Sequence, residues 1–376
     1  MRWLDKLTDE PTQAPPPNQP DSVEEPVVTH EEQTEEPKEW TYPKVQRRAM
    51  GSMFEIYLAG TDREAMLAGG EEALDEVERL ERQLSHYRND SDIARLNIHA
   101  REQWVRLEPR LYELLKHCHD LTMATGGAFD ITAGPLIKAW GFFKGEGRIP
   151  SESERSEILD NLGTERILFD DQDHLVYFTN PKLEINLGAI GKGFAVDAAA
   201  RTLHFFGIDH AVIHGGLSTI YALGEPPATN SDESPIVEGP DTESSSLIPH
   251  PSSLPAGWPF DIKDPRDRET VLETVYLKDE ALSTSGNYEQ FFEVDGTRYT
   301  HIIDPRTGMP VQGMMSVSVI TDNAADSDAL STAFFVMGRD ATEEYCRAHP
   351  NIRVIMVEES AEDIKVTKIG FDTLLI

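Results

Sequence analysis

The sequence has 376 residues, of which 39% are hydrophobic and 24 are proline, so it can form one large or two ordinary domains beside segments of low order. Its net charge of −33 at pH 7 argues against nucleic acid or an anionic membrane surface as a partner, because phosphates would be repelled. No run approaches 18 apolar residues, so no membrane span is predicted.

Residues 1–44 hold 11 acidic residues, 4 basic residues and 8 prolines. Such a segment cannot bury enough apolar surface to offset its ordering entropy, so we predict a disordered acidic tail. The first residues show no apolar h-region and no cysteine after a small-residue site, so neither a secretory nor a lipoprotein signal is predicted and we expect a cytoplasmic protein. The two cysteines, Cys118 and Cys346, are expected to be reduced thiols, although a single bridge between them stays open.

The body of the chain, residues 45–376, mixes helical and strand patterns. In chain order the first half predicts a strand, three helices, two short strands and a helix: 54–58, 62–84, 109–124, 151–162, 167–169, 175–178 and 192–206. The second half predicts strands, a hairpin with its turn at Asp295-Gly296, and a helix: 211–214, 271–277, the hairpin, 315–321 and 326–337. This mixture of alternating and clustered order favours an α+β fold over a doubly wound sheet.

A low-complexity tract, residues 225–257, interrupts the body between two strand-like segments. It contains 6 acidic residues, 7 prolines and no Lys or Arg. We predict an unstructured surface loop, because the entropy cost of loop closure grows only slowly with length.

Three glycine-rich segments are candidates for close approach to a ligand. Residues 125–135 place Phe129 and Asp130 at the rim of a permissive loop, although a helix cap and a turn would explain the same residues. Residues 186–197 run from a strand into a helix N-terminus, whose free N–H groups suit a phosphate, yet they match neither GxGxxG nor a P-loop. His214-Gly-Gly is a third tight turn, and an ordinary strand end explains it more simply.

Three polar segments follow. Residues 281–289 carry three successive hydroxyls, which suit a phosphate or a turn. Residues 301–310 hold His, Asp, Arg and Thr within seven positions, a density that a surface turn alone does not require. Asp328 and Thr332 lie one turn apart at the start of a helix, so their oxygens share one face and suit a hard cation such as Mg²⁺, whereas helix capping explains Asp326 better.

Together and in this order, these segments resemble the ApbE-type FAD:protein FMN transferases. The resemblance covers about residues 46–340 without the inserted tract, and seven ordered motifs are far more specific than any one of them. The motifs are Met50-Gly-Ser, LSHYRNDSDIARLN (84–97), GAFDITAGPL (127–136), NLGAIGKGFAVD (186–197), TSGNY (284–288), HIIDPRTGMP (301–310) and SDALST (327–332).

The resemblance implies an α+β fold of two lobes with a flavin cleft between them. It implies that Mg²⁺ lies beside the FAD pyrophosphate, held by Asp328, Thr332 and the backbone oxygen of Ala189. It makes His301 the candidate catalytic residue near the acceptor hydroxyl. The residues expected to contact FAD are Met50, Tyr87, Ala128, Phe129, Asp130, Asn186, Lys192 and, through its backbone, Ile302.

The implied reaction moves the FMN part of FAD onto a Thr or Ser hydroxyl of an acceptor flavoprotein and releases AMP. Two alternatives stay open: an FAD pyrophosphatase, in which water replaces the hydroxyl and gives FMN and AMP, and a flavin-binding protein without turnover. Two departures from the family pattern stand out. Asn186 occupies a position where the family usually has Asp. No lipoprotein signal like that of many members is recognised, which points to a cytoplasmic form or an incomplete N-terminus.

Overall fold

The structure is a computed structural model that describes residues 39–143, 145, 147–216, 218–227, 256–360 and 363–371. The chain divides into two units, residues 1–40 and 41–376, and every helix and strand described belongs to the second. The tracts predicted to be disordered, 1–44 and 225–257, lie outside the described residues except at their ends. At the first of these ends, Thr41 bridges to Gly60, so regular structure begins a few residues before the predicted boundary.

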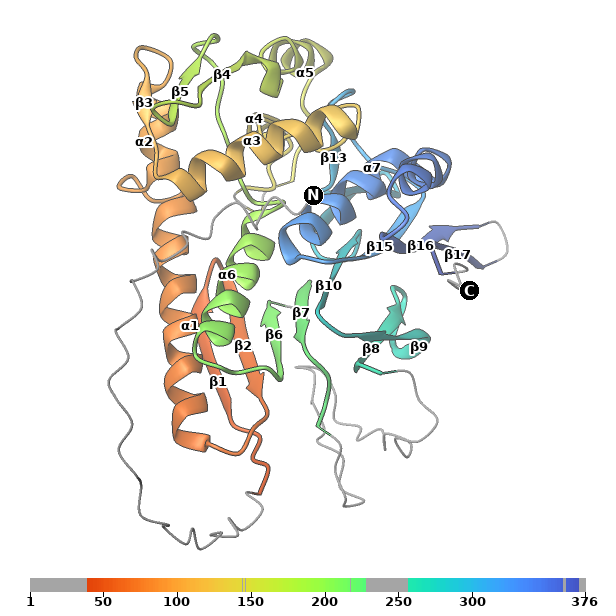
Figure 1. Ribbon diagram of the computed structural model, residues 1–376. Coiled ribbons are helices and arrows are strands. Elements are labelled where there is room, and N and C mark those ends of the chain that lie inside the picture. Colours follow the sequence, from red (N-terminus) through yellow and green to blue (C-terminus); the bar gives the residue numbers. More distant parts are fainter. Residues whose placement is uncertain are drawn as a thin grey trace, which may run out of the picture. The chain divides into compact units, whose positions relative to one another are not determined.

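An eight-stranded antiparallel sheet forms the centre of this unit (Figure 1). The strand order is β1-β2-β6-β7-β10-β15-β16-β17. The strands are β1 (Lys44–Ala49), β2 (Ser52–Leu58), β6 (Ala211–Gly215), β7 (Thr219–Leu223), β10 (Glu280–Gly286), β15 (Met314–Thr321), β16 (Arg353–Glu359) and β17 (Ile364–Ile369).

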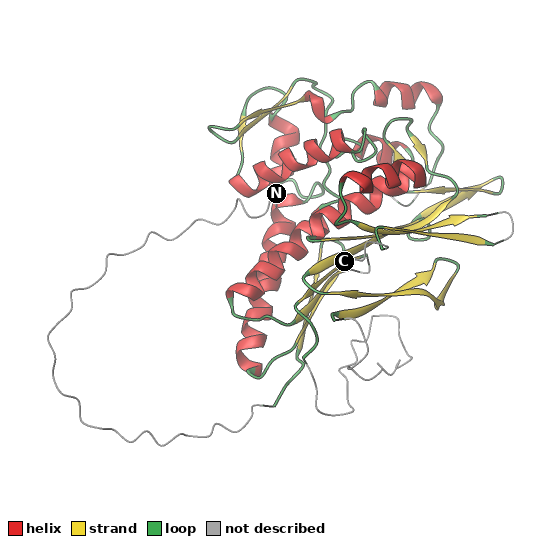
Figure 2. Ribbon diagram, turned by 45° about the vertical axis from the view of Figure 1, so that its right-hand side comes forward, coloured by secondary structure: helices red, strands yellow, loops and turns green. Residues whose placement is uncertain are grey.

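Three helices cover one face of the sheet: α1 (Arg63–Leu84), α6 (Gly191–Phe205) and α7 (Ala324–Ala348). Figure 2 shows them together on one side of the strands. Helix α6 packs between α1 and α7, and α7 lies on β10 and β15. The helical geometry of α7 breaks at Gly338, where φ is 71° and ψ is 179°, a conformation that glycine adopts without a Cβ clash.

The hairpin of β8 (Trp258–Asp264) and β9 (Asp267–Leu277) has a buried face of its own. Trp258 and Leu277 pack in one cluster with Val212 of β6, Leu282 of β10 and Ile320 of β15. These strands therefore bury apolar side chains on both faces, against the three helices and against the hairpin.

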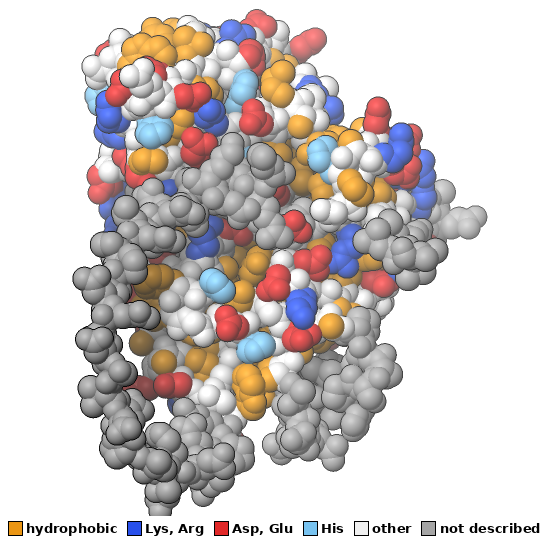
Figure 3. Space-filling view, in the orientation of Figure 1, with side chains coloured by type: hydrophobic (Ala, Val, Ile, Leu, Met, Phe, Trp, Pro, Cys, Tyr) orange, Lys and Arg blue, Asp and Glu red, His pale blue; other side chains and the backbone are white. Residues whose placement is uncertain are grey.

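A smaller lobe lies beyond one end of the sheet (Figure 1). Its helices are α2 (Asp92–His99), α3 (Pro109–Ala124), α4 (Gly134–Ala139) and α5 (Glu152–Leu159). Its sheet has the order β3-β5-β4, with β3 (Val105–Arg106), β4 (Ile167–Asp170) and β5 (Leu175–Phe178). Figure 3 shows hydrophobic side chains gathered on the surface at this end.

Two short hairpins complete the unit: β11 (Phe291–Val294) with β12 (Thr297–Thr300), and β13 (Ile303–Asp304) with β14 (Met309–Pro310). The first confirms the predicted turn, since Asp295 and Gly296 both have positive φ, as two-residue hairpin turns require. The rings of Phe292 and Tyr299 pack against Trp140 beside α4.

The α+β fold is confirmed, and so are the first four predicted helices, each within a few residues. The last, predicted over 326–337, begins as expected but continues past the break at Gly338 to Ala348. Ser151 caps α5, accepting from the N–H of Glu154. Both cysteines are free and buried. Among the described residues, no helix is long and apolar enough to cross a membrane.

Candidate functional site

The N-termini of α6 and α7 meet at the centre of the site. The N–H of Gly193 donates to Oδ2 of Asp328 at 3.0 Å. A Cβ at Gly193 would lie 2.0 Å from the carbonyl oxygen of Ala324, so only glycine permits this approach. Gly193 thus allows the carboxylate of Asp328 in α7 to reach the first turn of α6.

Asp197, one turn further along α6, fixes the start of α7. Its two carboxylate oxygens accept from the N–H groups of Ala324 and Ala325 at 2.7 and 2.9 Å. These N–H groups have no partner inside their own helix, so Asp197 acts as a cap supplied by another helix. Burial raises the pKa of Asp197 to about 7, against the opposing effect of the two N–H donors.

Asp328 and Thr332 lie on the buried side of α7, as their spacing predicts. Oδ1 of Asp328 accepts from the hydroxyl of Thr219 at 3.3 Å, and the hydroxyl of Thr332 lies 3.2 Å from that of Ser285. Among the described residues, the hydrogen-bond partners of the Asp328 carboxylate are neutral groups, and its side chain is buried. A buried carboxylate without a cationic partner suits a metal ion.

The carbonyl of Ala189 precedes the first turn of α6. In a regular helix the N–H of Gly193 would return to this carbonyl, but it donates to Asp328 instead. The Ala189 oxygen is therefore not used by that helical bond. Carbonyl, carboxylate and hydroxyl oxygens form the donor set that Mg²⁺ prefers, so these residues fit the implied metal. No group of three His, Cys, Asp or Glu side chains suited to a metal occurs in the described ranges.

The hydroxyls of residues 283–285 belong to a strand inside the sheet and do not cap a turn. Ser283 and Ser285 face α7, where they bond to Ser327 and Ser331 at 2.7 and 2.8 Å. Thr284 points to the other face and bonds to Ser318 of β15 at 2.8 Å. The alternative of a turn is wrong, because the neighbouring elements supply polar partners for a polar strand.

Lys192 belongs to the first turn of α6, and its ammonium group contacts the hydroxyl of Ser218. Ser218 lies in the turn between β6 and β7, where Gly216 has a φ of 72°. The carbonyl of Ser218 accepts from the N–H of Thr284 at 2.8 Å. The turn after His214, given a minor role from sequence, therefore lies beside both Lys192 and β10.

Asn186 and Asp130 come from two motifs that the fold joins. The N–H of Asn186 donates to the carbonyl of Ile131 at 2.8 Å, and its side-chain oxygen accepts from the N–H of Gly188 at 2.8 Å. One carboxylate oxygen of Asp130 accepts from the N–H and the hydroxyl of Thr132, both at 2.7 Å. Burial raises the pKa of Asp130, and these two bonds oppose the shift.

Ala128 and Phe129 are 1% and 2% exposed, so their side chains belong to the core. The prediction that Phe129 lies at the rim of a loop is wrong, because its apolar ring packs inward. The main-chain N–H of Phe129 keeps a hydrogen bond although it is buried, because it donates to the hydroxyl of Thr125 at 3.2 Å. A flavin contact of these residues would therefore involve the main chain.

Met50 and Tyr87 lie near the ends of β1 and α1. Met50 has a φ of 50° in the turn between β1 and β2, and its N–H donates to Glu81 of α1 at 2.9 Å. Tyr87 follows α1 with 67% of its surface exposed, and its ring stacks on Phe143 with centroids 4.9 Å apart. An exposed aromatic face of this kind can stack on a flat ligand.

The cluster 301–310 forms the turn between β13 and β14. Asp304 accepts from the guanidinium of Arg306 through both oxygens, at 2.8 and 2.9 Å, and Trp140 donates to the carbonyl of Gly308 at 2.8 Å. The carbonyl of Ile302 accepts from the N–H of Val311 at 3.0 Å. Asp304 and Arg306 thus build the turn, while His301 stands just before it.

His301 is the candidate catalytic side chain of this cluster. Its Nδ1 lies 3.2 Å from the carbonyl oxygen of Gln290, and its Nε2 lies 4.0 Å from a carboxylate oxygen of Glu289. Burial lowers the pKa of His301, and Glu289 opposes this shift. A lowered pKa favours the neutral form of the ring, which can accept a proton.

Hydrogen bonds link the segments 125–135, 186–197, 218–219, 283–285 and 327–332. The segment 301–310 is joined instead to Trp140, beside α4, and to Val336 of α7. Met50 bonds to Glu81, and Tyr87 stacks on Phe143. Sequence reasoning assigned no role to Asp197, Ser218, Thr219 or Glu289. Asp197 ends a quoted motif and could have been found from it. Thr219 carries no local signal, because its role depends on a residue more than 100 positions away.

Comparison with known proteins agrees with this arrangement. A family model described as "ApbE family" matches residues 50–356. A Vibrio cholerae protein named FAD:protein FMN transferase is 30% identical over 295 residues, covering 77% of this chain and 79% of its own, and one from Treponema pallidum is 30% identical over 294 residues, covering 76% of each.

Solved structures show the same fold. A structure of the ApbE protein from Thermotoga maritima superposes with a TM-score of 0.72 at 28% identity, covering 88% of this chain and 97% of the other. The flavin transferase ApbE from Vibrio cholerae superposes with a TM-score of 0.70 at 27% identity, covering 89% and 99%.

Proposed function

The chain belongs to the ApbE family, and from this premise we propose how it acts as an FAD:protein FMN transferase. The substrate is FAD, and the FMN part is transferred to a Thr or Ser hydroxyl of an acceptor flavoprotein. AMP leaves, and the reaction depends on Mg²⁺. The observation that carries the proposal is the buried carboxylate of Asp328 at the junction of α6 and α7.

The metal would be held by Asp328, Thr332 and the carbonyl of Ala189. Asp328 is buried beside neutral partners, so a divalent cation would compensate its charge. Bound there, Mg²⁺ would offset the negative charge of the FAD pyrophosphate. This local charge explains how a chain with a net charge of −33 accepts a dianionic ligand.

The flavin would lie against the segments that carry the residues expected to contact FAD. Lys192, held by Ser218, supplies a positive charge near the pyrophosphate. Tyr87 offers an exposed ring for stacking, and the 125–135 loop and Asn186 offer main-chain and amide groups. Ile302 is next to His301 in the chain, so a contact of its backbone with FAD would bring the ligand toward the candidate base.

His301 would act as the general base. Its neutral Nε2 removes the proton of the acceptor hydroxyl, and the oxygen attacks the phosphorus on the FMN side of the pyrophosphate. The bond from this phosphorus to the bridging oxygen breaks, and AMP leaves. General base catalysis, in which the proton is removed as the new bond forms, accelerates reactions of this type by about 10²–10⁴-fold.

The test is to incubate the chain with FAD, Mg²⁺ and a candidate acceptor flavoprotein, and to weigh the acceptor by mass spectrometry. We expect covalent FMN on one Thr or Ser and an equal amount of AMP. Free FMN and AMP with an unmodified acceptor would identify a pyrophosphatase, and bound but unchanged FAD would identify a flavin-binding protein.

Asp328→Ala tests the metal site in the same assay. Losing the carboxylate should reduce transfer by about 100-fold or more and abolish Mg²⁺ binding in calorimetry of the FAD-bound protein. Asp340→Ala removes an equal charge from the exposed end of α7 and serves as the control. Unchanged Mg²⁺ dependence in Asp328→Ala would place the metal elsewhere.

A further inference from the structure

Gln290 fixes the orientation of the His301 ring. The main-chain N–H of His301 donates to the carbonyl of Gln290 at 3.1 Å, and ring Nδ1 lies 3.2 Å from the same oxygen. A carbonyl oxygen only accepts hydrogen bonds, so Nδ1 carries a hydrogen atom. In the neutral ring the lone pair is therefore on Nε2.

Glu289 faces this second nitrogen. One of its carboxylate oxygens lies 4.0 Å from Nε2, and its own side chain is 40% exposed. Among the residues that the structure describes, the ring of Phe142 lies edge-on to His301, with centroids 6.4 Å apart, and the cation of Lys192 from α6 also acts on the imidazole charge. Burial and Lys192 oppose protonation of His301, while Glu289 and the Gln290 carbonyl favour it.

We propose that Glu289 is a positioning residue of the transfer reaction, acting through His301. This inference rests on the proposed function. Glu289 stabilises the imidazolium that forms when Nε2 takes the hydroxyl proton. The O–H bond of the acceptor breaks and an N–H bond forms at Nε2. The oxygen electron pair makes the new bond to the FMN phosphorus, and the pair of the broken P–O bond leaves with AMP.

Before the proton moves to His301, Glu289 contributes little to the stability of the site. With His301 neutral, the carboxylate faces a lone pair and gains nothing from it. With His301 protonated, the same distance becomes an ion pair. The interaction is thus stronger in the transition state than in the ground state, which is the condition for raising kcat.

Glu289→Gln tests this inference, because it keeps the shape and removes the charge. We expect the pKa of His301, followed by NMR of the imidazole in the ligand-free full chain, to fall by about one unit. The acid limb of the kcat profile should move to lower pH, and kcat should fall about threefold to tenfold with KM for FAD unchanged. Glu289→Asp should restore part of both effects.

Glu293→Gln is the matched control, since it removes an equal charge from the adjacent hairpin, where Glu293 pairs with Arg298 at 3.3 Å. An unchanged His301 titration in Glu289→Gln, or an equal shift in Glu293→Gln, overturns the inference. His301→Asn separates it from the proposed function. If that variant still transfers FMN at the original rate, the assigned base is wrong, whereas its inactivity beside an unaffected Glu289→Gln refutes only the role of Glu289.

Discussion

Asp197 and Asp328 are buried carboxylates of one helix junction, and their surroundings assign them different roles. Asp197 gives both oxygens to the first N–H groups of α7, so its charge is met by the positive end of that helix. Asp328 receives one N–H and one hydroxyl, and neither carries a charge. The first carboxylate therefore builds the site, and the second is available to a cation.

Asn186 occupies the position where the resemblance to the family leads us to expect Asp. Its side-chain oxygen accepts from the N–H of Gly188, a role that an aspartate can also fill. We predict that Asn186→Asp keeps the turn and tightens FAD binding about fivefold in the presence of Mg²⁺, because a charge-assisted hydrogen bond exceeds a neutral one by ~1 kcal/mol.

Titration of FAD against both forms, with and without Mg²⁺, checks this prediction. Weaker binding of the aspartate form would place the residue directly against the pyrophosphate. Identical curves would remove it from the site.

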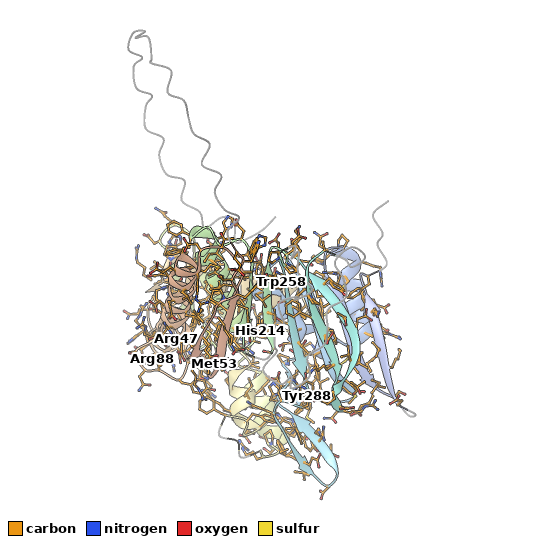
Figure 4. The ribbon with its side chains drawn as sticks, turned by 90° about the horizontal axis from the view of Figure 1, so that it is seen from below. Arg47, Met53, Arg88, His214, Trp258 and Tyr288 are labelled. Atoms are coloured by element: carbon orange, nitrogen blue, oxygen red, sulfur yellow. The ribbon has the colours of Figure 1, made fainter. Side chains whose placement is uncertain are left out.

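His214 on β6 should make the fold sensitive to acid. It is labelled in Figure 4 and is buried against the rings of Tyr57 and Phe260. Its Nε2 has no hydrogen-bond partner among the described residues. Burial lowers its pKa to about 4. The unfolded chain, with a histidine pKa near ~6.5, binds a proton first, so stability falls as pH drops from about 6.5 to 4, by ~3 kcal/mol in total.

Chemical denaturation at several pH values measures this loss. His214→Phe should flatten the slope in that window, whereas His204→Gln, a change at an exposed histidine of α6, should not. Equal slopes in all three proteins would mean that other groups dominate the acid response.

At the scale of elements, the junction of α6 and α7 decides where the metal ligands lie. We predict that Gly193→Ala destabilises the protein by about 1–3 kcal/mol and weakens Mg²⁺ binding, because the added methyl group meets the Ala324 carbonyl at 2.0 Å. Thermal unfolding and calorimetry measure the two effects.

Gly191→Ala is the control for this change. A Cβ at Gly191, two residues away in the same helix, lies 3.9 Å from its nearest neighbour and should be tolerated. Equal losses in both variants would point to the general cost of replacing glycine in this turn, and not to the contact with α7.

At the scale of the whole molecule, periodicity and capping predicted most helices and the α+β class, because both are local signals. Strand β10 was not predicted, since its three hydroxyls resemble a turn until Ser318, Ser327 and Ser331 are brought to it. The order of the motifs along the sequence identified Asp328 and His301 as candidate site residues. Motif order could not identify Thr219 or Glu289, because their roles depend on contacts between distant or irregular segments.

Removing residues 1–38 and replacing 228–255 by a short Gly/Ser linker should leave FAD affinity unchanged, because every assigned site residue lies elsewhere. A short linker can span the gap, since the indole of Trp258 donates to the carbonyl of Leu223 at 3.2 Å. FAD titration and the thermal midpoint check this.

Deleting residues 1–44 is the contrasting variant. It also removes the bridge of Thr41 to Gly60 and the ion pair of Lys44 with Glu55, so its midpoint should be lower than that of the shorter deletion. Equal midpoints would show that residues 39–44 do not stabilise the fold. Lost FAD binding in the shorter deletion would show that the removed tracts take part in the site.

The break at Gly338 divides α7 into two parts that are buried to different extents. Residues 324–337 are mostly buried between the sheet and α6, whereas Thr342 and Cys346 are the buried residues of the part that follows. Local opening needs less free energy where few contacts are lost. Amide hydrogen exchange should therefore be slow before Gly338 and fast after it, so the part of α7 that carries Asp328 stays closed while the helix end opens and closes on its own.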